Sequence, residues 1–453
     1  MILLFSQGCS ANLSESEQIA GLLAENNFEV EWAGANKNEN IEAVILNLCT
    51  VKGDSSALKA VRNAKENYPD TPMLVTGCTT PELITSLQKI DSRISAASTH
   101  AVERIPGLLK RIIAGEIILD TQKEHSPKLG IPKIRKNPIV GIVSIAEGCM
   151  DACSFCSTRM VKGRLKSYVP EQIVNEAKTL VEGGCKEIWL TAQDAACYGF
   201  DIGTDLAELV LQILLKVKGD YRIRMGMGNP RHTLGYADKL VEVYRDSRVF
   251  KFLHLPVQSG SNGVLQAMKR KHSVEDYKKL VNIFYSEFSD FAISTDIIVG
   301  FPGETEADFQ QSLDLIKWSK PTGCNRTRFV PRRGTVAAAM PNQIPSTEKY
   351  ARSAELTKVF TEVALQNNSK YIGRELSILI DEVGKRNSWL GRANNYKPVA
   401  VHGDYKIGDM VNVKIKDAEA FALIGEEKNI RLCEDLLLLN HHLHPQPNYL
   451  PNL

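Results

Sequence analysis

Three cysteines within one short segment place the strongest constraint on this chain. Cys149, Cys153 and Cys156 have the spacing C-x3-C-x2-C, and Phe155 stands directly before the last thiol. Thiolates of this kind are ligands of iron–sulfur clusters, and a four-iron cluster normally has four of them. Three ligands this close together would leave one iron open. The alternative is a zinc site, but it needs a fourth nearby ligand, and the next cysteine or histidine after Cys156 is Cys185.

The same spacing, with its aromatic residue, resembles the signature of the radical S-adenosylmethionine (SAM) superfamily. The resemblance implies that SAM chelates the open iron and is cleaved reductively. The product is a carbon radical that can attack an unactivated C–H bond.

Cysteine content and apolar patterning indicate the cellular compartment of the protein. It has ten cysteines in 453 residues, and its start, Met1–Ser6, has no charged leader of the kind that directs export. No apolar run approaches the roughly twenty residues of a membrane span. We therefore expect a cytoplasmic protein without membrane contact, whose cysteines serve metal or redox chemistry instead of disulfides.

Charge is spread unevenly, although the net charge is only +2. Residues 131–168 contain seven Lys or Arg against two acidic residues, Glu147 and Asp151. A basic collar around the cysteine loop would suit a polyanionic substrate. A solvated basic face is the other interpretation of the same residues.

The first hundred residues alternate between strand and helix patterns, which favours a parallel sheet covered by helices. The predicted strands are Ile2–Ser6, Ala43–Leu48 and Met73–Thr76, and the predicted helices are Ser14–Asn26, Ser55–Glu66 and Pro81–Gln88. Each strand is followed almost at once by a cysteine, namely Cys9, Cys49 and Cys78. The carboxyl ends of parallel strands share one edge, so these thiols can converge on a second cluster. Purely structural cysteines would more naturally face the core from inside the strands.

A proline-punctuated connector, residues 121–138, precedes a second αβ series. Six strands are predicted in it, Ile139–Ala146, Glu187–Ala192, Tyr221–Met227, Val249–Pro256, Phe291–Val299 and Asn325–Val330, with helices such as Pro170–Glu182 and Ser273–Phe288 between them. Six such units fit a partial (β/α)6 barrel, in which chemistry is carried by loops after the strands. The three-cysteine loop follows the first of these strands.

The pattern changes again at about Tyr371, to short alternating strands with glycine turns. Strands are expected at Glu375–Asp381, Trp389–Ala393, Lys397–Val401 and Met410–Ile415. They predict a five-stranded β-barrel of the oligonucleotide-binding kind. The last residues, 434–453, contain His and Pro and are expected to form a disordered tail in preference to a metal site.

Taken together, residues 1–433 resemble the methylthiotransferases, radical SAM enzymes that add a methylthio group to RNA or protein. The resemblance implies an N-terminal domain with cluster cysteines (1–120), a linker (121–138), a radical SAM barrel (139–370) and a TRAM domain (371–433). Several stretches resemble the archaeal and eukaryotic branch that acts on tRNA, namely Glu187–Asp194, Tyr198-Gly199, Asp201–Leu206, Met225–Pro230, His254–Ser261 and Asp296–Thr305. One departure is Arg333, within Arg332–Thr335, where the family usually has proline.

The resemblance also implies an activity and its cofactors. That branch places a methylthio group on carbon 2 of N6-threonylcarbamoyladenosine at position 37, in the anticodon stem-loop of tRNA. The cysteine triads would each hold a 4Fe-4S cluster: Cys149, Cys153 and Cys156 the radical SAM cluster, and Cys9, Cys49 and Cys78 an auxiliary cluster that carries sulfur. SAM, a sulfur donor and an electron donor such as ferredoxin or flavodoxin complete the system.

Further site residues are expected around these cysteines. Cofactor contacts are predicted for Gln193, Asp194, Asn229, Gln258, Gly300 and Gly303, where ordinary turn chemistry is the alternative. RNA contacts are predicted for Arg159, Lys162, Arg164 and Lys166, and passive thiols for Cys185, Cys197, Cys324 and Cys433. Two other functions remain open: the same chemistry on isopentenyladenosine in tRNA or on a ribosomal-protein aspartate, and a non-catalytic iron–sulfur RNA-binding protein.

Overall fold

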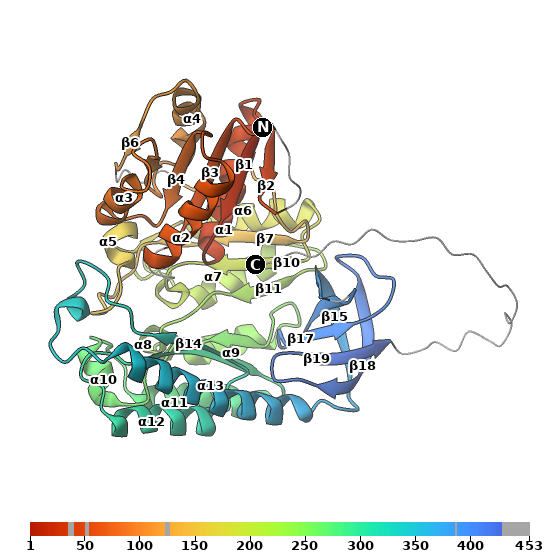
Figure 1. Ribbon diagram of the computed structural model, residues 1–453. Helices are drawn as coiled ribbons and strands as arrows, with labels where there is room; N and C mark the ends of the chain where they lie inside the picture. The colour runs from red at the N-terminus through yellow and green to blue at the C-terminus, as the bar shows by residue number, and fades with distance from the viewer. Residues whose placement is uncertain (35–39, 50–53, 123–126, 386, 428–453) are drawn as a thin grey trace, which may run out of the picture.

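The computed structural model describes residues 1–34, 40–49, 54–122, 127–385 and 387–427. Figure 1 shows an N-terminal sheet domain in red and orange, a central barrel in yellow to teal and a small blue β-barrel. Cys433 and the predicted tail at 434–453 lie outside the described residues. The expected α/β class, with a C-terminal β-barrel, is confirmed.

The N-terminal domain is a parallel sheet with strand order β2-β1-β3-β4-β5-β6. Its strands are β1 (Ile2–Ser6), β2 (Val30–Trp32), β3 (Ala43–Leu48), β4 (Met73–Gly77), β5 (Ser95–Ala97) and β6 (Leu119–Asp120). Its helices are α1 (Ser10–Glu25), α2 (Asp54–Asn67), α3 (Pro81–Gln88) and α4 (Ile105–Ile113). The three predicted strands are confirmed. The other three are short, and β2 and β6 lie at the sheet edges, where apolar patterning is weak.

The central domain contains the six expected parallel strands, in chain order around a partial barrel. They are β7 (Val140–Ser144), β10 (Glu187–Thr191), β11 (Arg222–Met225), β12 (Phe252–His254), β13 (Ala292–Val299) and β14 (Gly323–Arg328). Two three-stranded sheets, β11-β10-β7 and β12-β13-β14, are joined by a parallel bridge between Ile223 and Val249. Their carboxyl ends therefore face one common side, where the cysteine loop begins after β7.

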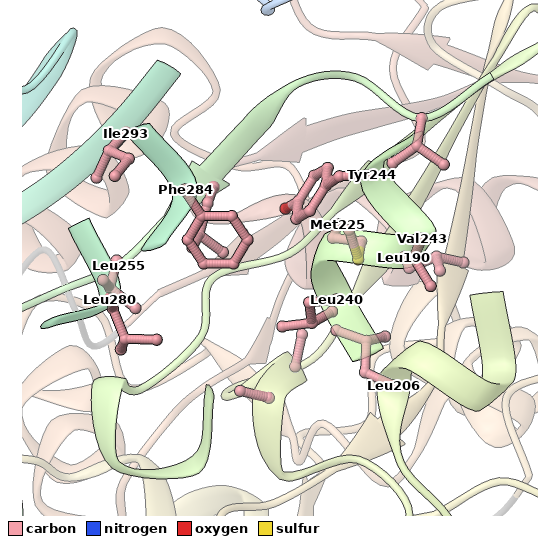
Figure 2. Close-up of a cluster of buried hydrophobic side chains, with 14 of the residues drawn as sticks. Leu190, Leu206, Met225, Leu240, Val243, Tyr244, Leu255, Leu280, Phe284 and Ile293 are labelled. Atoms are coloured by element: carbon pink, nitrogen blue, oxygen red, sulfur yellow. The ribbon is translucent and has the colours of Figure 1, made fainter. Parts of the chain in front are cut away.

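The largest hydrophobic core lies between these strands and the surrounding helices, which include α6 (Pro170–Glu182), α7 (Leu206–Lys216), α9 (Ala237–Arg245), α11 (Val274–Glu287) and α12 (Glu306–Ser319). Figure 2 shows how strand residues such as Leu190 and Met225 meet helix residues such as Leu240. Tyr244 stands edge-on to Phe284, with 5.6 Å between ring centroids. Each such buried side chain contributes roughly 1.5–3 kcal/mol, so the barrel is a rigid support for its loops.

The C-terminal strands close into the expected five-stranded barrel, in the order β15-β16-β17-β19-β18. They are β15 (Glu375–Val383), β16 (Trp389–Ala393), β17 (Pro398–Val401), β18 (Met410–Ala418) and β19 (Leu423–Glu427). The long helix α13 (Ser346–Ser369) packs on β14 and leads into this barrel. Tyr396 contacts Phe250 and Phe252 of the central domain, so the two barrels share an aromatic seam.

Among the residues that the structure describes, no helix combines the length and the apolar character that a membrane span requires.

Candidate active site at the carboxyl ends of two parallel sheets

The radical-type cysteine motif occupies a tight loop after β7. A short hairpin of β8 (Ala146–Glu147) and β9 (Lys166–Ser167) holds the base of this loop. Gly148 has φ +72°, and a Cβ there would lie 2.1 Å from the carbonyl oxygen of Arg164. Only glycine fits this approach. Cys149 then donates its N–H to the Gly163 carbonyl at 3.3 Å, which fixes the first thiol of the triad.

The three thiols of this loop lie within electrostatic reach of one another. Burial, together with the nearby Asp194 carboxylate and the Cys156 and Cys153 thiols, raises the pKa of Cys149 to about 12. Arg270 contacts the Cys153 sulfur at 3.7 Å, yet burial still raises the pKa of that thiol. Thiolates gathered in such a recess need a cationic centre, and a metal cluster supplies one. The donor set therefore fits a 4Fe-4S cluster with one open iron.

Two thiols of the second cysteine triad, those of Cys9 and Cys78, meet at one side chain, Asn12 of α1. Its amide oxygen accepts the thiol of Cys9 at 3.3 Å and faces the thiol of Cys78 at 4.0 Å. A hydrogen bond from the Cys49 thiol lowers the pKa of Cys9 to about 6, whereas burial raises the pKa of Cys78 to about 11. The structure thus brings the three strand-end thiols together. That they hold an auxiliary cluster stays a prediction.

Asn12 itself is held by the sheet below it. Its amide nitrogen donates to the Asn47 side chain at 3.1 Å and to the Leu48 carbonyl at 3.0 Å. Asn47 in turn donates to the Asn12 carbonyl and to Ser16. Sequence reasoning missed this pair, although a buried asparagine two residues before Cys49 was a usable signal. The pair orients the amide oxygen of Asn12 toward the thiols of Cys9 and Cys78.

A buried ion cluster of Glu15, Lys128, Glu147 and Lys162 joins the two cysteine-bearing regions. Lys128 Nζ lies 2.7 Å from a carboxylate oxygen of Glu15 and 2.7 Å from one of Glu147. Lys162 forms a close ion pair with Glu15 and a hydrogen bond with Thr99. Burial alone would raise the pKa of Glu15, but the two lysines lower it. Glu15 lies on the helix that follows Cys9, while Glu147 and Lys162 flank the radical-type loop.

The four cations predicted to contact RNA do not share one surface. Arg164 and Lys166 are exposed, and Arg159 is half-buried, with a guanidinium nitrogen 3.5 Å from the Met150 carbonyl. Lys162 has only 2% of its surface exposed. The prediction that it contacts RNA is wrong, because its ammonium group is committed to Glu15 inside the protein. For the other three residues, RNA contact stays a prediction.

Asp194 and Asn229, predicted cofactor ligands, lie beside the radical-type loop in one polar network. Asp194 accepts His232 Nδ1 at 2.8 Å and the Asn229 backbone N–H at 3.0 Å. The Asn229 amide donates to Asp151 at 2.7 Å, and Arg231 contacts the other oxygen of the same carboxylate at 2.7 Å. Asp151 stands between two cysteines of the motif. The network therefore fixes the loop, and a direct cofactor contact stays a prediction.

The remaining predicted contacts also lie at the carboxyl ends of the barrel strands. Gln193 has a buried amide oxygen with no hydrogen-bond partner in the described structure, and Gln258 has φ +77°. Gly300 donates its N–H to Glu304 at 2.6 Å, and a Cβ there would lie 2.3 Å from Lys349 of α13. The close approach that Gly300 permits is thus to α13. Contact of Gly300 or Gly303 with an adenine stays a prediction.

The cysteines outside the triads are buried where the structure describes them. Cys185, Cys197 and Cys324 have little exposed surface. Cys197 donates its S–H to the backbone oxygen of Asp194 at 3.2 Å. Its sulfur also lies near the Asp194 and His232 side chains, but these two already bond to each other. A passive role for these thiols stays a prediction.

A cleft of about 720 Å³ opens beside the radical-type loop. Its lining includes Ser56 of α2, Phe155 of the loop, Asp296 of β13, and Arg326, Arg328 and Arg332 on or after β14. It therefore borders both the N-terminal domain and the barrel. Arg332 begins the Arg332–Thr335 stretch singled out in the sequence, whereas no motif marks Arg326 or Arg328. The only sequence signal was the spacing of Arg326 and Arg328, two apart on one strand face.

The departure at Arg333 leaves the local loop intact. Thr335 donates its N–H to the Arg332 carbonyl at 3.1 Å, and Gly334 has φ +78°. This is a four-residue turn with a left-handed third residue, and Arg333 occupies the second position. Proline is common there because it presets φ, but the position accepts other residues.

Comparisons with known proteins agree with this architecture. Residues 2–97 match the model of "Uncharacterized protein family UPF0004", residues 143–316 that of the radical SAM superfamily, and residues 369–427 that of the TRAM domain. A protein of Pyrococcus horikoshii named "Probable threonylcarbamoyladenosine tRNA methylthiotransferase" is 38% identical over 92% of this chain and 97% of its own. A Xenopus laevis protein named "Threonylcarbamoyladenosine tRNA methylthiotransferase" is 34% identical over 92% of this chain and 75% of its own.

Among solved structures, the radical SAM methyltransferase TsrM from Kitasatospora setae aligns with a TM-score of 0.52. It is 14% identical, and the alignment covers 74% of this chain and 76% of TsrM. That likeness concerns the fold alone. The relatives match across all three domains, at an identity well above that of fold neighbours. The chain therefore belongs to the threonylcarbamoyladenosine tRNA methylthiotransferase family of radical SAM proteins.

Proposed function

We propose that this protein adds a methylthio group to carbon 2 of N6-threonylcarbamoyladenosine at position 37 of tRNA. The observation that carries the proposal is a cleft that borders both cysteine-bearing regions. Phe155 lines it from between the second and third cysteines of the radical-type motif, and Ser56 lines it from the N-terminal domain. Ser56 also accepts a hydrogen bond at 3.1 Å from Gln7, two residues before Cys9.

The family implies SAM and a 4Fe-4S cluster, and Cys149, Cys153 and Cys156 are the residues that would hold this cluster. We propose that Cys9, Cys49 and Cys78 hold an auxiliary 4Fe-4S cluster. When bound, these groups supply the radical and the sulfur that replace an inert C–H bond, for which side chains alone have no suitable chemistry.

The chain's own residues would position the reactants. The carboxylate of Asp296 accepts His254 Nε2 and the Asn325 amide, each at 2.7 Å, and so the cleft floor is preorganised. Asp151 and Asn229 hold the radical-type loop at the barrel rim. Asn12 orients the thiols of the second triad. The recess limits access of water to the reacting carbon, which protects a radical from side reactions.

Partners and cellular setting extend the same proposal. The substrate is tRNA, bound at its anticodon stem-loop, with Arg159, Arg164 and Lys166 and the TRAM barrel as its contacts. A sulfur donor and an electron donor such as ferredoxin or flavodoxin must restore the clusters between turnovers. Because thiolate ligands require reducing conditions, we place the reaction in the cytoplasm. The domain limits 1–120, 139–370 and 371–433 belong to this proposal.

Nucleoside mass spectrometry tests the proposed reaction. Anaerobically reconstituted protein is incubated with reductant, SAM, sulfide and tRNA that bears threonylcarbamoyladenosine. The 2-methylthio derivative is the expected product. If 5′-deoxyadenosine forms but this tRNA is unchanged, the substrate assignment fails, and isopentenyladenosine tRNA and the ribosomal protein are assayed instead. Absence of SAM cleavage would favour a non-catalytic iron–sulfur RNA-binding protein.

Iron analysis separates the two clusters. Wild-type protein should contain about eight irons per chain, and a Cys49→Ala variant about four. The variant should still cleave SAM but form no methylthio product. Equal iron content in the two proteins, or full activity of the variant, would refute the auxiliary site. Cys185→Ala is the matched control, because Cys185 is buried in the barrel core away from both triads.

A further inference from the structure

Charge in the cleft is unbalanced in favour of cations. Its lining includes Arg326, Arg328 and Arg332 against one acid, Asp296, whose carboxylate already accepts two hydrogen bonds. In the described part of the chain, no carboxylate lies within ion-pair distance of Arg328. Three cationic groups in one recess predict an anionic ligand.

The three arginines differ in what they contact. Arg332 donates to the Phe155 carbonyl at 3.2 Å and so is committed to the radical-type loop. Arg326 lies 4.9 Å from the ring of Phe360 and 5.9 Å from that of Phe421, toward the TRAM barrel. Arg328 is the last residue of β14, at the end of the strand nearest to the chemistry. It is therefore the arginine best placed for a ligand that enters the cleft at the carboxyl edge of the barrel.

Stacking sets the orientation of the Arg328 guanidinium. Its central carbon lies 3.7 Å from the ring centroid of Tyr350, near the start of α13. A guanidinium that stacks on a ring keeps its N–H donors free in its own plane, where they match the two oxygens of a carboxylate. The side chain is half-buried. It is thus pre-oriented at little further cost in conformational freedom.

We propose that Arg328 binds the carboxylate of the threonylcarbamoyl substituent, an inference that rests on the proposed function. The base must enter the cleft for its carbon 2 to come near the Phe155 loop, and the substituent on N6 enters with it. An isopentenyl substituent has no charge, so a bound isopentenyladenosine would leave the Arg328 guanidinium desolvated and unpaired. Arg328 would therefore also discriminate against that substrate.

A chemical double-mutant cycle tests this contact. Two anticodon stem-loop RNAs are prepared, one with threonylcarbamoyladenosine and one with its carboxamide, which lacks the negative charge. Their affinities for wild-type and Arg328→Gln protein are measured, together with Arg328→Lys. Wild type should prefer the carboxylate RNA about 10- to 100-fold, the range for a charge-assisted hydrogen bond. Arg328→Gln should bind the two RNAs equally, and Arg328→Lys should show a reduced preference.

Arg333→Gln is the matched control. It removes the same charge from an exposed side chain that does not line the cleft, so the preference for the carboxylate should persist. If Arg328→Gln leaves the preference for the carboxylate RNA unchanged, the proposal fails. Weaker binding of both RNAs by the same factor would then indicate that the guanidinium binds phosphate. Thermal melting of each variant confirms that the fold is retained.

The cycle also separates this inference from the proposed reaction. Product formation by wild-type protein on the carboxylate RNA is scored in parallel. A wild-type enzyme that forms product, with no coupling between Arg328 and the carboxylate, refutes the inference alone. An Arg328-dependent preference without product supports the binding site and refutes the proposed reaction.

Discussion

Replacing Lys162 by methionine would remove one cation from the buried ion cluster while retaining most of the side chain's volume. In the intact cluster, two lysines balance two glutamates, and the four side chains are 2–6% exposed. The variant leaves a net negative charge among them. Glu15 keeps one cationic neighbour, Lys128, at 2.7 Å.

The magnitude follows from that arrangement. Removing one partner of a buried ion pair costs about 3–5 kcal/mol, because the other charge is left desolvated. Since Lys128 still faces Glu15, we expect the lower end, about 3 kcal/mol. For a cooperative unit of about 200 residues, this lowers the melting temperature by roughly 6–12 °C. The double variant Lys162→Met with Glu15→Gln restores neutrality and should recover part of the loss.

The assay is anaerobic thermal melting of the cluster-free protein, with hydrogen exchange of α1 and of the loop before Lys162 as a local readout. Lys239→Met is the matched control, because Lys239 also pairs with two carboxylates, Asp205 and Glu208, but is 52% exposed. Solvent screens such a pair, so little change is expected. If Lys162→Met melts like Lys239→Met, the reasoning about the buried cluster is refuted. The salt dependence of tRNA binding should not change in Lys162→Met.

Three further predictions concern single residues. Gly148→Ala should abolish assembly of the radical-type cluster and lower the iron content by about four per chain, because the added Cβ would meet the carbonyl of Arg164. Gly107→Ala is the control: a Cβ at this position faces open space, so the iron content should not change. Arg333→Pro should stabilise the turn by about 0.4–1 kcal/mol, seen as a higher melting temperature; a lower one would contradict the turn assignment. Burial raises the pKa of Glu17 to about 7, so the folded state loses stability as pH rises from about 4.5 to 7. Glu17→Gln should match wild type at pH 4.5 and exceed it by up to about 3 kcal/mol at pH 8, measured by urea denaturation at both values.

The elements that sequence predicted well are those set by local pattern. The spacing of Cys149, Cys153 and Cys156 is a property of eight consecutive residues, and it needs no knowledge of the rest of the fold. Alternation of strand and helix patterns predicted both parallel sheets, and in each sheet it placed cysteines after the carboxyl ends of strands. Because the carboxyl ends of parallel strands lie at one edge, the sequence also predicted that Cys9 and Cys78 lie close together, although they are far apart in sequence. Short edge strands, such as β6, were missed because two residues carry no periodicity.

Only the tertiary structure decided which charged groups face solvent and which face one another. Lys162 lies only two residues before Arg164, yet Lys162 is buried against Glu15 and Arg164 is exposed. Likewise, Lys128 and Glu15 lie 113 residues apart, and Arg328 acquires its orientation from Tyr350 on another element. An ion pair or a stacked guanidinium depends on distances across the fold, and local composition holds no information on such distances. The spacing of the cysteines and their positions after strands were thus determined by the sequence itself, whereas the ion pairs around them were determined by packing.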